Sequence, residues 1–381
     1  MPVPTADDVY FMRLAIRGAR RGVGSTRPNP PVGAVVVGAD GTVLGHGHHN
    51  KAGGPHAEVN AVADCGEGAD LSSATIYVTL EPCSTTGRTP PCTDLLIAKK
   101  FRRVVIGCTD PNPKHAGRGV DILRAAGIQV DVGVCEEDCR ELIAPFASAM
   151  LRKRPHVTLK LALTLDGKIA DRSGTSKWIT GAAARGYVQH LRRGADAILV
   201  GSGTVLADDP SLLCRLPGCE TGAWRVIVDS RGRLPASARV LADDHAGLTV
   251  VATTSVGAVY LVARLPLNPV PQIWTMPVGP DRRIDLRALL ERLTADLDVM
   301  ELLCEGGGEL AGALLKAGLV DRLVLFYAPV VLGDASARPG FADVNALLSE
   351  GRLATATRRL RSFGEDFAVQ YDLTEANGRD S

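Results

Sequence analysis

The chain is expected to fold as two α/β domains, and three features of the sequence lead to this expectation. A chain of 381 residues is too long to fold around one ordinary hydrophobic core, so two domains are expected, with three also possible. Short apolar strand patterns alternate with helical patterns in both halves, which is typical of α/β layers. A short cationic stretch closed by a proline, Leu151–Pro155, separates the halves, although an ordinary solvated helix end would look similar. We therefore place the domains at 1–150 and 151–381.

The first domain is expected to begin with a helix from about Ala6 to Arg21. Thr5 and Asp8 form a capping-box pattern, and apolar residues then recur at helical spacing. The predicted strands are Val32–Val37, Ala74–Leu80, Arg103–Gly107 and Ile128–Val132. The predicted helices are His56–Asp64, Thr93–Lys99 and Gly119–Ala126, followed by a last helix that ends near Met150. This order of elements predicts an α/β layer sandwich.

The second domain repeats the alternation of strands and helices. Its predicted strands are Val157–Leu163, Ala197–Gly201, Arg225–Val228, Leu248–Ala252, Met300–Cys304 and Leu323–Tyr327. A helix is expected from about Leu310 to Ala317, directly after three glycines. We expect Asn377–Ser381 to fray.

His56-Ala57-Glu58, followed by Pro82-Cys83 and Pro91-Cys92, supplies three metal ligands and one carboxylate. A catalytic zinc keeps three protein ligands and leaves one position for water, and His56, Cys83 and Cys92 would fill the three. Glu58 would then move protons, as the glutamate of this pattern does in zinc deaminases. A closed structural zinc site normally has four Cys or His ligands and no role for such a glutamate. The pattern therefore predicts a hydrolytic deaminase.

The spacing of the two cysteines departs from the usual deaminase pattern. Two residues ordinarily separate them, whereas here Ser84–Pro91 intervene. This insertion is polar, contains turn-forming glycine and prolines, and places one cation, Arg88, near the expected substrate. A loop of this composition can recognise a substrate.

Three polar, glycine-containing turns of the second domain follow apolar strands. They lie at Lys160–Lys168, Gly201–Pro210 and Glu305–Glu309. Ligands of α/β sheets gather beyond the carboxyl ends of strands, and backbone amides at Gly306-Gly307-Gly308 could hold a pyrophosphate. The same glycines could instead form only a tight strand-to-helix turn, and Asp208 could be a helix cap. Together the three turns make a nucleotide site plausible.

Charge and cysteine content restrict the function classes. The formal net charge is +1 and aromatic residues make up 4% of the chain, so a nucleic-acid partner is not expected. The sequence shows neither a signal region nor an apolar run long enough to cross a bilayer. It contains nine cysteines, an odd number that cannot all pair in disulfides within one chain. We expect a cytoplasmic protein with reduced thiols and no membrane partner. The cysteines expected to be small buried hydrophobes are Cys65, Cys108, Cys135, Cys139, Cys214, Cys219 and Cys304.

The two domains together resemble the bifunctional deaminase-reductase family of riboflavin biosynthesis. In the first domain the resemblance rests on Pro28–Ala34, His49, Ala52-Gly53, Pro55–Glu58, Glu81-Pro82-Cys83, Gly87–Cys92 and Asp110–Pro113. In the second it rests on Leu163–Lys168, Ser176–Thr180, Thr204–Pro210, Val228–Ser230 and Glu305–Gly308. It implies a cytidine-deaminase-like three-layer α/β/α domain followed by a dihydrofolate-reductase-like α/β domain. The long cysteine spacing is the one that the family has.

The resemblance also implies roles for individual residues of the first domain. Zinc would bind His56, Cys83 and Cys92, and Glu58 would be the proton donor. The residues implied near the substrate are Asn29, His49, Arg88, Asp110 and Asn112. The implied reaction is deamination of diaminohydroxyphosphoribosylaminopyrimidine.

The second domain would then use NADPH to reduce the ribosyl side chain of 5-amino-6-(5-phosphoribosylamino)uracil. The implied cofactor contacts are Ala162, Trp178, Thr204, Asp208, Ser230, Gly307 and Gly308. The two glycines belong to a turn that runs from Gly307 to Ala313. The implied substrate contacts are Ser176, Arg192, Leu212, Arg215 and Glu305. Arg192 and Arg215 suit the sugar phosphate, because a guanidinium can hold phosphate oxygens in a bidentate fork. Lys160 also matches the family, and its role could be structural.

Two alternatives to this function remain on the sequence alone. One is a zinc deaminase acting on a base in RNA or DNA, and the other is a zinc-stabilised scaffold that senses a nucleotide. Balanced charge argues against the first, and Glu58 beside an open ligand position argues against the second. We expect a homo-oligomer acting on a small phosphoribosylamino-pyrimidine. The segments 213–220 and 255–280 match no pattern of the family.

Overall fold

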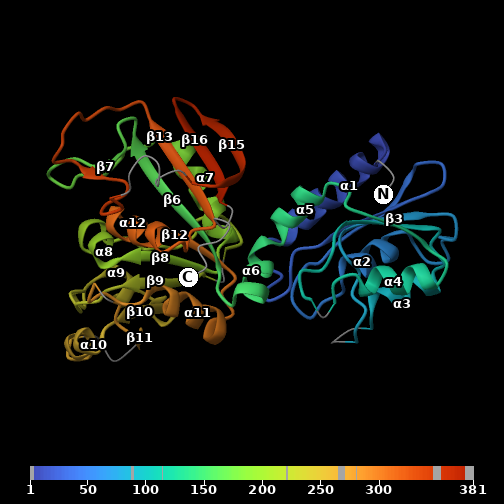
Figure 1. The fold of residues 1–381 in the computed structure, drawn as a ribbon, viewed down its shortest axis with the longest axis horizontal. Helices are drawn as coiled ribbons and strands as arrows, with labels where there is room; N and C mark the ends of the chain where they lie inside the picture. The colour runs from blue at the N-terminus through green and yellow to red at the C-terminus, as the bar shows by residue number, and fades with distance from the viewer. Residues whose placement is uncertain are drawn as a thin grey trace. The chain divides into compact units, whose positions relative to one another are not determined.

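The computed structural model describes residues 4–86, 90–113, 115–219, 222–264, 271–279, 281–345 and 353–373. The chain divides into two compact units, unit 1 at Met1–Lys153 and unit 2 at Arg154–Ser381 (Figure 1). Within the described residues, no helix is long and apolar enough to cross a membrane.

The described residues of unit 1 form a five-stranded mixed sheet in the order β2-β1-β3-β4-β5. The strands are β1 (Gly33–Val37), β2 (Val43–His48), β3 (Thr75–Leu80), β4 (Arg103–Cys108) and β5 (Gln129–Val132). β1 runs antiparallel to β2 and β3, whereas β3, β4 and β5 are parallel. The carboxyl ends of β3 and β4 therefore meet at one edge of the sheet, where Cys83 and Asp110 follow.

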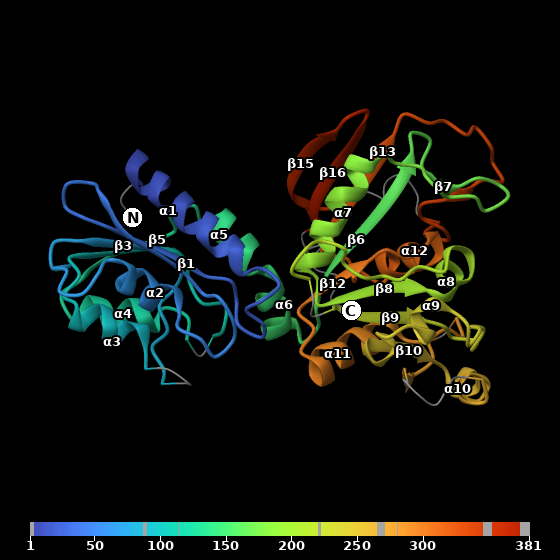
Figure 2. The same ribbon diagram turned by 180° about the vertical axis from the view of Figure 1, so that it is seen from behind.

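Helices cover both faces of this sheet, as Figures 1 and 2 show. α1 (Ala6–Ala19) and α5 (Glu136–Leu142) lie on one face, and α2 (Ala57–Asp64), α3 (Cys92–Ala98) and α4 (Arg118–Ala125) lie on the other. The alternation of β1 explains the two cores, because Val35 packs with α1 and Val36 packs with α2. α6 (Ala144–Arg152) ends the unit. The predicted three-layer α/β/α fold is confirmed.

The described residues of unit 2 form a nine-stranded sheet in the order β11-β10-β9-β8-β12-β6-β13-β16-β15. Its strands are β6 (His156–Thr164), β8 (Ala197–Gly201), β9 (Trp224–Val228), β10 (Thr249–Thr253), β11 (Gln272–Thr275), β12 (Glu301–Cys304), β13 (Arg322–Ala328), β15 (Thr355–Phe363) and β16 (Asp366–Leu373). The sheet is parallel from β11 to β13, and β16 and β15 add an antiparallel edge. β7 (Lys168–Ala170) and β14 (Arg338–Pro339) form a separate two-stranded ribbon.

Each face of the large sheet has its own hydrophobic core. α11 (Leu286–Leu297) and α12 (Gly308–Lys316) cover one face, and α7 (Ala182–Gly194), α8 (Ser202–Asp208), α9 (Arg239–Ala242) and α10 (Ser255–Val262) cover the other (Figure 2). Leu199 of β8 packs toward α11 and α12, whereas its neighbour Val200 packs with α8 and α9. The α/β architecture predicted for this half is confirmed.

The structure adds strands that the sequence patterns did not predict. These are β2, β7, β11 and the three C-terminal strands β14, β15 and β16. β15 contains Arg358, Arg359 and Arg361, so its apolar alternation is weak, and charged residues of this kind are common on edge strands. The first helix ends at Ala19 rather than Arg21, and a 3-10 turn, Arg20–Gly22, follows it. The predicted frayed end, 377–381, lies outside the described residues.

Candidate functional site

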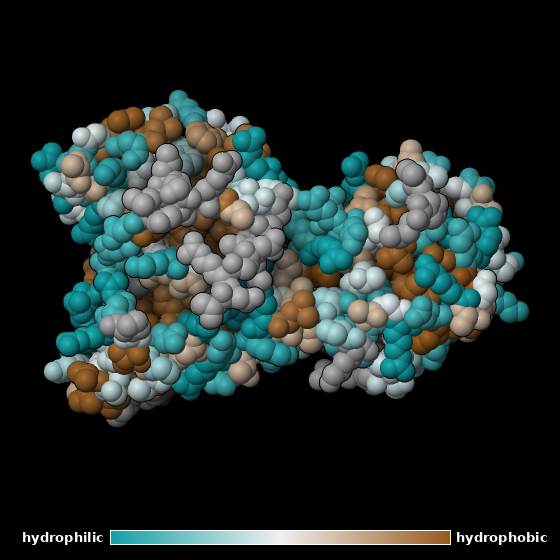
Figure 3. All heavy atoms as spheres, viewed as in Figure 1, coloured by the Kyte–Doolittle hydropathy of each residue, from teal (hydrophilic) through white to brown (hydrophobic). Residues whose placement is uncertain are grey.

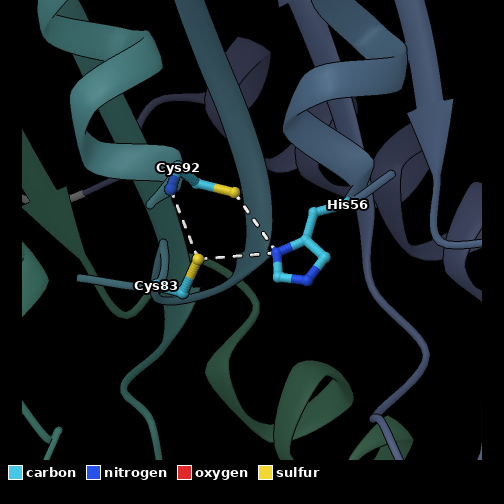
Figure 4. Close-up of side chains that lie close together, drawn as sticks. All are labelled: His56, Cys83 and Cys92. Carbon is cyan, nitrogen blue, oxygen red and sulfur yellow. Dashed lines mark hydrogen bonds between the residues drawn. The ribbon is translucent and has the colours of Figure 1, made fainter. Parts of the chain in front are cut away.

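His56, Cys83 and Cys92 converge between the starts of two helices of unit 1 (Figure 4). His56 is the N-cap of α2, Cys92 is the first residue of α3, and Cys83 follows β3. The start of α3 faces Cys83, because the Cys92 N–H donates to Cys83 Sγ at 3.3 Å, which favours the Cys83 thiolate. The three predicted metal ligands, which lie up to 36 residues apart in the chain, are together in space.

The donor atoms have the spacing of a zinc site. His56 Nδ1 lies 3.5 Å from Cys83 Sγ and 3.3 Å from Cys92 Sγ. Tetrahedral zinc with ordinary bond lengths would separate such nitrogen and sulfur ligands by roughly 3.6 Å. Within the described residues this is the one His/Cys/Asp/Glu group whose atoms all lie within 4.8 Å of one another. One imidazole and two thiols are donors that suit zinc, and they leave a coordination position for water.

The protonation of the two thiols also favours a cation. Hydrogen bonds from Cys92 and from His56 lower the pKa of Cys83, and the neighbouring Cys83 sulfur raises the pKa of Cys92, so that without a cation the pair shares one proton. Two thiolates in contact repel one another, and a divalent metal ion removes that repulsion. The residues present therefore fit a zinc ion.

Glu58 lies in the first turn of α2, two residues after His56, and is 3% exposed. Burial raises the pKa of its carboxyl group to about 7. A carboxylic acid with such a pKa can accept or donate a proton near neutral pH. It is the buried acid-base group that the sequence pattern placed beside the ligands.

Asn29 and His49 join the same site from different elements. The rings of His49 and His56 lie edge to face, with centroids 5.5 Å apart. His49 Nε2 lies 3.2 Å from the Asn29 side-chain amide, and its Nδ1 lies 3.0 Å from the Pro55 carbonyl. These contacts orient His49 beside the metal ligands, so two of the predicted substrate contacts lie at the site.

Asp110 and Asn112 follow β4 in a loop that is anchored by Glu81. The buried Glu81 carboxylate accepts backbone N–H groups of Asp110 at 3.1 Å, Gly117 at 2.9 Å and Gly119 at 2.8 Å. Asp110 in turn accepts the N–H of Asn112 at 2.8 Å, and burial raises the pKa of Asp110. Sequence reasoning assigned no role to Glu81, because no spacing pattern relates it to residues about 30 positions later. Arg88, the remaining predicted contact, lies outside the described residues.

The predicted nucleotide and substrate residues of unit 2 line one cleft of about 940 Å³. It lies at the carboxyl ends of β6, β8, β9 and β12. The predicted residues found in its wall are Ala162, Ser176, Trp178, Arg192, Thr204, Asp208, Leu212, Arg215, Ser230, Glu305, Gly307 and Gly308. This position is the one expected for a ligand of a parallel sheet.

Glu305, Arg192 and Lys160 form a buried charged group in this cleft. Arg192 donates two hydrogen bonds to the Glu305 carboxylate, at 2.7 and 3.1 Å. Burial alone would raise the pKa of Glu305, but the charges of Arg192, Lys160 and Arg215 outweigh it and hold the pKa below its usual value. Burial lowers the pKa of Lys160, whose ammonium lies 5.7 Å from the Phe326 ring centroid. The sequence signal for this buried contact was Lys160 itself, a charged residue between Leu159 and Leu161 in strand β6.

The two predicted phosphate-binding arginines differ in their surroundings. The guanidinium of Arg192 is turned to Glu305 and to the carbonyl of Leu213, so its fork is already occupied. Arg215 is exposed, and its guanidinium has no hydrogen-bonded partner among the described residues. Arg215 is therefore the arginine of the pair that can meet a phosphate.

Two features of the cleft fit a dinucleotide. The N-terminus of α12 at Gly307 has no side-chain cap, so its first amides are available to phosphate oxygens. Asp229, which is 1% exposed in the cleft wall, accepts the N–H of Leu234 with one oxygen. Its other oxygen, Oδ1, has no hydrogen-bond partner among the described residues, although Arg233 Nε lies 4.0 Å away as an ion-pair partner. A ligand hydroxyl would satisfy that buried acceptor.

The cysteines without an assigned role are only partly as expected. Cys108, Cys139 and Cys304 are buried. Cys65, Cys135, Cys214 and Cys219 are half-buried, because they lie in turns and at helix ends rather than in the core. The prediction of small buried hydrophobes is therefore wrong for these four residues, although Cys65 and Cys135 pack partly buried against the cores of unit 1.

Family models match both units. The cytidine and deoxycytidylate deaminase zinc-binding region matches residues 5–108, and the RibD C-terminal domain matches residues 155–369. The riboflavin biosynthesis protein RibD of Aquifex aeolicus is 42% identical over 96% of this chain and 98% of its own length. RibD of Escherichia coli is 40% identical over 86% of this chain and 89% of its own length.

Solved structures agree over nearly the whole chain. RibD of Acinetobacter baumannii has a TM-score of 0.81 and 38% identity, covering 97% of this chain and 99% of that one. A diaminohydroxyphosphoribosylaminopyrimidine deaminase/5-amino-6-(5-phosphoribosylamino)uracil reductase of Thermotoga maritima has a TM-score of 0.83 and 36% identity, with the same coverage. Since the likeness in sequence and in fold extends through both units, the chain belongs to the RibD family of riboflavin biosynthesis proteins.

Proposed function

We propose that this protein is the bifunctional deaminase and reductase of riboflavin biosynthesis, a zinc- and NADPH-dependent enzyme. Residues 1–150 deaminate diaminohydroxyphosphoribosylaminopyrimidine, and residues 151–381 reduce the ribosyl group of 5-amino-6-(5-phosphoribosylamino)uracil. The observation that carries the proposal is the presence, in one chain, of a three-ligand His/Cys/Cys group beside a buried glutamate and of a separate nucleotide-sized cleft. The second site acts on what the first would produce.

In the deaminase, His56, Cys83 and Cys92 hold zinc, which when bound supplies a Lewis acid that makes water acidic near neutral pH. The Glu58 carboxylate takes a proton from the attacking water and gives it to the ring nitrogen. It then takes a second proton from the added hydroxyl group and gives it to the departing amino group, which leaves as ammonia. Asn29, His49, Asp110, Asn112 and Arg88 orient the pyrimidine. Burial of Glu58 suits this two-way role, because it brings the pKa to about 7.

In the reductase, NADPH bound in the cleft supplies the reducing electrons. Its contacts are Ala162, Trp178, Thr204, Asp208, Ser230, Gly307 and Gly308. Arg215 binds the sugar phosphate, and Asp208 and Glu305 supply the proton and hydroxyl contacts of the ring-opened sugar. Arg192 keeps Glu305 ionised and fixed through its two hydrogen bonds. Ser176 and Leu212 complete the substrate wall.

A coupled assay tests the proposal. The full chain with zinc is given the diamino-pyrimidine substrate, and ammonia release is followed before NADPH is added. We expect ammonia first and NADPH oxidation afterwards, in proportion to the ammonia formed. Ammonia release from cytidine in RNA or DNA, without release from the phosphoribosylamino-pyrimidine, would overturn the proposal.

We further propose that the protein is a cytoplasmic homo-oligomer. Val256, Val259, Tyr260 and Val262 of α10 are between 53% and 69% exposed, an apolar helix face of the kind that subunit contacts cover. Figure 3 shows hydrophobic atoms at the lower left, where Figure 1 places α10. Light scattering during gel filtration measures the mass, and a monomer at micromolar concentration would contradict the oligomer.

A further inference from the structure

Two cysteines meet beside the reductase cleft and take no part in the proposed reactions. The sulfur atoms of Cys214 and Cys219 lie 2.8 Å apart, and both residues are half-buried. The turn between them is closed by a hydrogen bond from the Cys219 N–H to the Leu216 carbonyl, at 3.3 Å. Gly218, at φ +74, supplies the left-handed residue that this turn needs. The backbone therefore already holds the two thiols in contact.

The loop that contains this thiol pair, 211–219, is fastened to helix α7. Gln189 Oε1 accepts the Arg215 N–H at 2.9 Å, and Arg193 donates to the Pro217 carbonyl at 3.3 Å. Arg192 donates to the Leu213 carbonyl at 2.9 Å. The Arg192 hydrogen bond comes from a charged and largely buried guanidinium and holds the start of the loop. The part with the two cysteines is held by the neutral Gln189 contact and the exposed Arg193 contact, which are individually weak.

The same loop forms part of the cleft. Leu212 and Arg215 line its wall, and Leu212 is buried. Arg192, which holds the Leu213 carbonyl, also holds the carboxylate of Glu305. A change in the mobility of loop 211–219 would therefore affect both Arg215 and the carboxylate of Glu305.

A metal site does not explain the pair. Structural zinc and other thiophilic metals take three or four strong ligands, and a pair of cysteines supplies two. Within the described ranges, the group of three or more potential ligands is His56, Cys83 and Cys92 of unit 1. Thiol–disulfide chemistry is the remaining reaction for two thiols in contact.

We propose that Cys214 and Cys219 are a redox-active pair whose disulfide fastens loop 211–219 and thereby holds Arg215 in place for the substrate phosphate. The oxidant is a low-molecular-weight disulfide. One cysteine thiolate attacks it, forms a mixed disulfide and releases one thiol. The second cysteine then attacks the mixed disulfide, forms the Cys214–Cys219 bond and releases the other thiol. Two protein thiols are oxidised, one disulfide is reduced to two thiols, and the two protons go to the released thiolates.

The expected effect is on binding of the substrate. Because the sulfur atoms are already in contact, closing the bond needs little movement of the backbone, and the loop keeps its path. The bond removes loop freedom that binding would otherwise have to restrict. We expect the KM of the reductase for its phosphoribosyl substrate to fall about threefold on oxidation, with little change in kcat. This effect rests on the proposed reductase function, whereas formation of the disulfide does not.

The first experiment identifies the bond. The full zinc-loaded chain is equilibrated in mixtures of oxidised and reduced glutathione, free thiols are alkylated, and peptides are analysed by mass spectrometry. We expect a reversible Cys214–Cys219 linkage, absent from Cys214→Ser and present in the matched control Cys135→Ser. Alkylation of both cysteines under all conditions, or mixed disulfides with glutathione alone, would overturn the proposal.

The second experiment measures how the disulfide changes substrate binding by the reductase. Reductase KM and kcat are determined for oxidised and reduced protein, with Cys214→Ser as the variant that should not respond and deaminase turnover as the control in the same chain. A disulfide that forms without changing KM would refute the proposal that it fastens loop 211–219 and holds Arg215 in place. Absence of reductase activity from both the oxidised and the reduced wild-type protein would refute the proposed function instead, so the two failures are distinguishable.

Discussion

At the scale of single residues, the acid-base group of unit 1 is defined by its burial. Glu58 is placed in the first turn of α2 by the sequence, and the core of unit 1 surrounds it so that 3% of the residue remains exposed. A carboxylate in such surroundings loses hydration, which raises its pKa to about 7. Its position and its pKa together support the proposal that Glu58 moves a proton between water and the pyrimidine.

Replacing Glu58 by Gln keeps the shape of the side chain and removes its ability to exchange protons. We expect ammonia release to fall by about 100- to 10,000-fold. Zinc content, measured by elemental analysis, should stay at that of the wild type, because Glu58 is not a ligand. Reductase turnover of the same preparation is the control for folding. Ammonia release at the wild-type rate would rule out Glu58 as the proton carrier.

Arg192 controls the charge of Glu305. Burial acts to raise the pKa of Glu305, and Arg192 is the main opposing cause, so Glu305 is ionised in the wild type. In Arg192→Met the effect of burial remains and the largest opposing charge is gone, so the pKa rises. The acid limb of reductase kcat/KM should therefore move to higher pH.

A neighbouring arginine provides the matched control for this shift. Arg193→Met removes an exposed arginine from the next position of α7, which contacts the Pro217 carbonyl and Cys219 and not Glu305. Its pH profile should match that of the wild type. If Arg192→Met lowered the rate equally at every pH, Arg192 would act on the substrate and not through Glu305.

At the scale of elements, Glu81 connects the metal-binding strand end to the loop that presents Asp110 and Asn112. Its carboxylate accepts N–H groups of Asp110, Gly117 and Gly119. Glu81→Gln replaces one acceptor oxygen by an NH₂ group that faces N–H donors. We expect the KM of the deaminase to rise about tenfold, with zinc content unchanged. Glu67→Gln, the same change at an exposed position of unit 1, is the control.

Asp8 connects α1 to β4 and should make unit 1 sensitive to acid. Burial would raise its pKa, but hydrogen bonds from Arg103, Thr5 and Tyr77 lower the pKa to about 2. An unfolded Asp titrates near 3.9. Because the folded pKa is the lower one, the stabilisation is complete above the unfolded value and is lost as the pH falls toward 2.

Asp8→Asn tests this connection. We expect the free energy of unfolding of unit 1 to fall by about 2 kcal/mol at neutral pH, and the difference from the wild type to shrink below pH ~4. Urea unfolding of unit 1 can be followed by residual deaminase activity. Tryptophan fluorescence serves as the control, since all 3 tryptophans lie in unit 2. A difference that stays constant from neutral to acid pH would exclude the ionised carboxylate as the cause.

Local patterns predicted the elements that contain the chemistry. The Thr5–Asp8 capping box is present, as N-cap preferences predict, and His56 and Cys92 lie at helix starts. The family resemblance predicted which residues of unit 2 contact the cofactor and the substrate, and all of these residues line the cleft.

Contacts between distant residues could not be predicted in the same way. The Arg192–Glu305 pair joins residues 113 positions apart, and it occupies a guanidinium that the sequence assigned to phosphate. The anchoring by Glu81 and the contact of Cys214 with Cys219 likewise depend on how loops pack. β15 was missed because edge strands tolerate charged residues, and period-two patterning weakens there.

At the scale of the whole molecule, two chemistries are assigned to two units that each have their own cores. The His/Cys/Cys group belongs to unit 1, and the cleft with Glu305 and Arg192 belongs to unit 2. The described residues of unit 2 contain no comparable metal-ligand group. Zinc should therefore support one activity and leave the other independent of it.

Removal of zinc from the full chain tests this independence. After dialysis against a strong chelator, we expect ammonia release to be lost, while NADPH oxidation with 5-amino-6-(5-phosphoribosylamino)uracil stays within about twofold of the untreated protein. Added zinc should restore ammonia release, and added magnesium should not, because magnesium prefers oxygen ligands. The urea midpoint of unit 1 should also fall, since zinc bound by two thiolates stabilises only the folded state. Parallel loss of both activities would show that the metal of unit 1 supports the fold of the entire chain, and the two sites could then no longer be treated as separate.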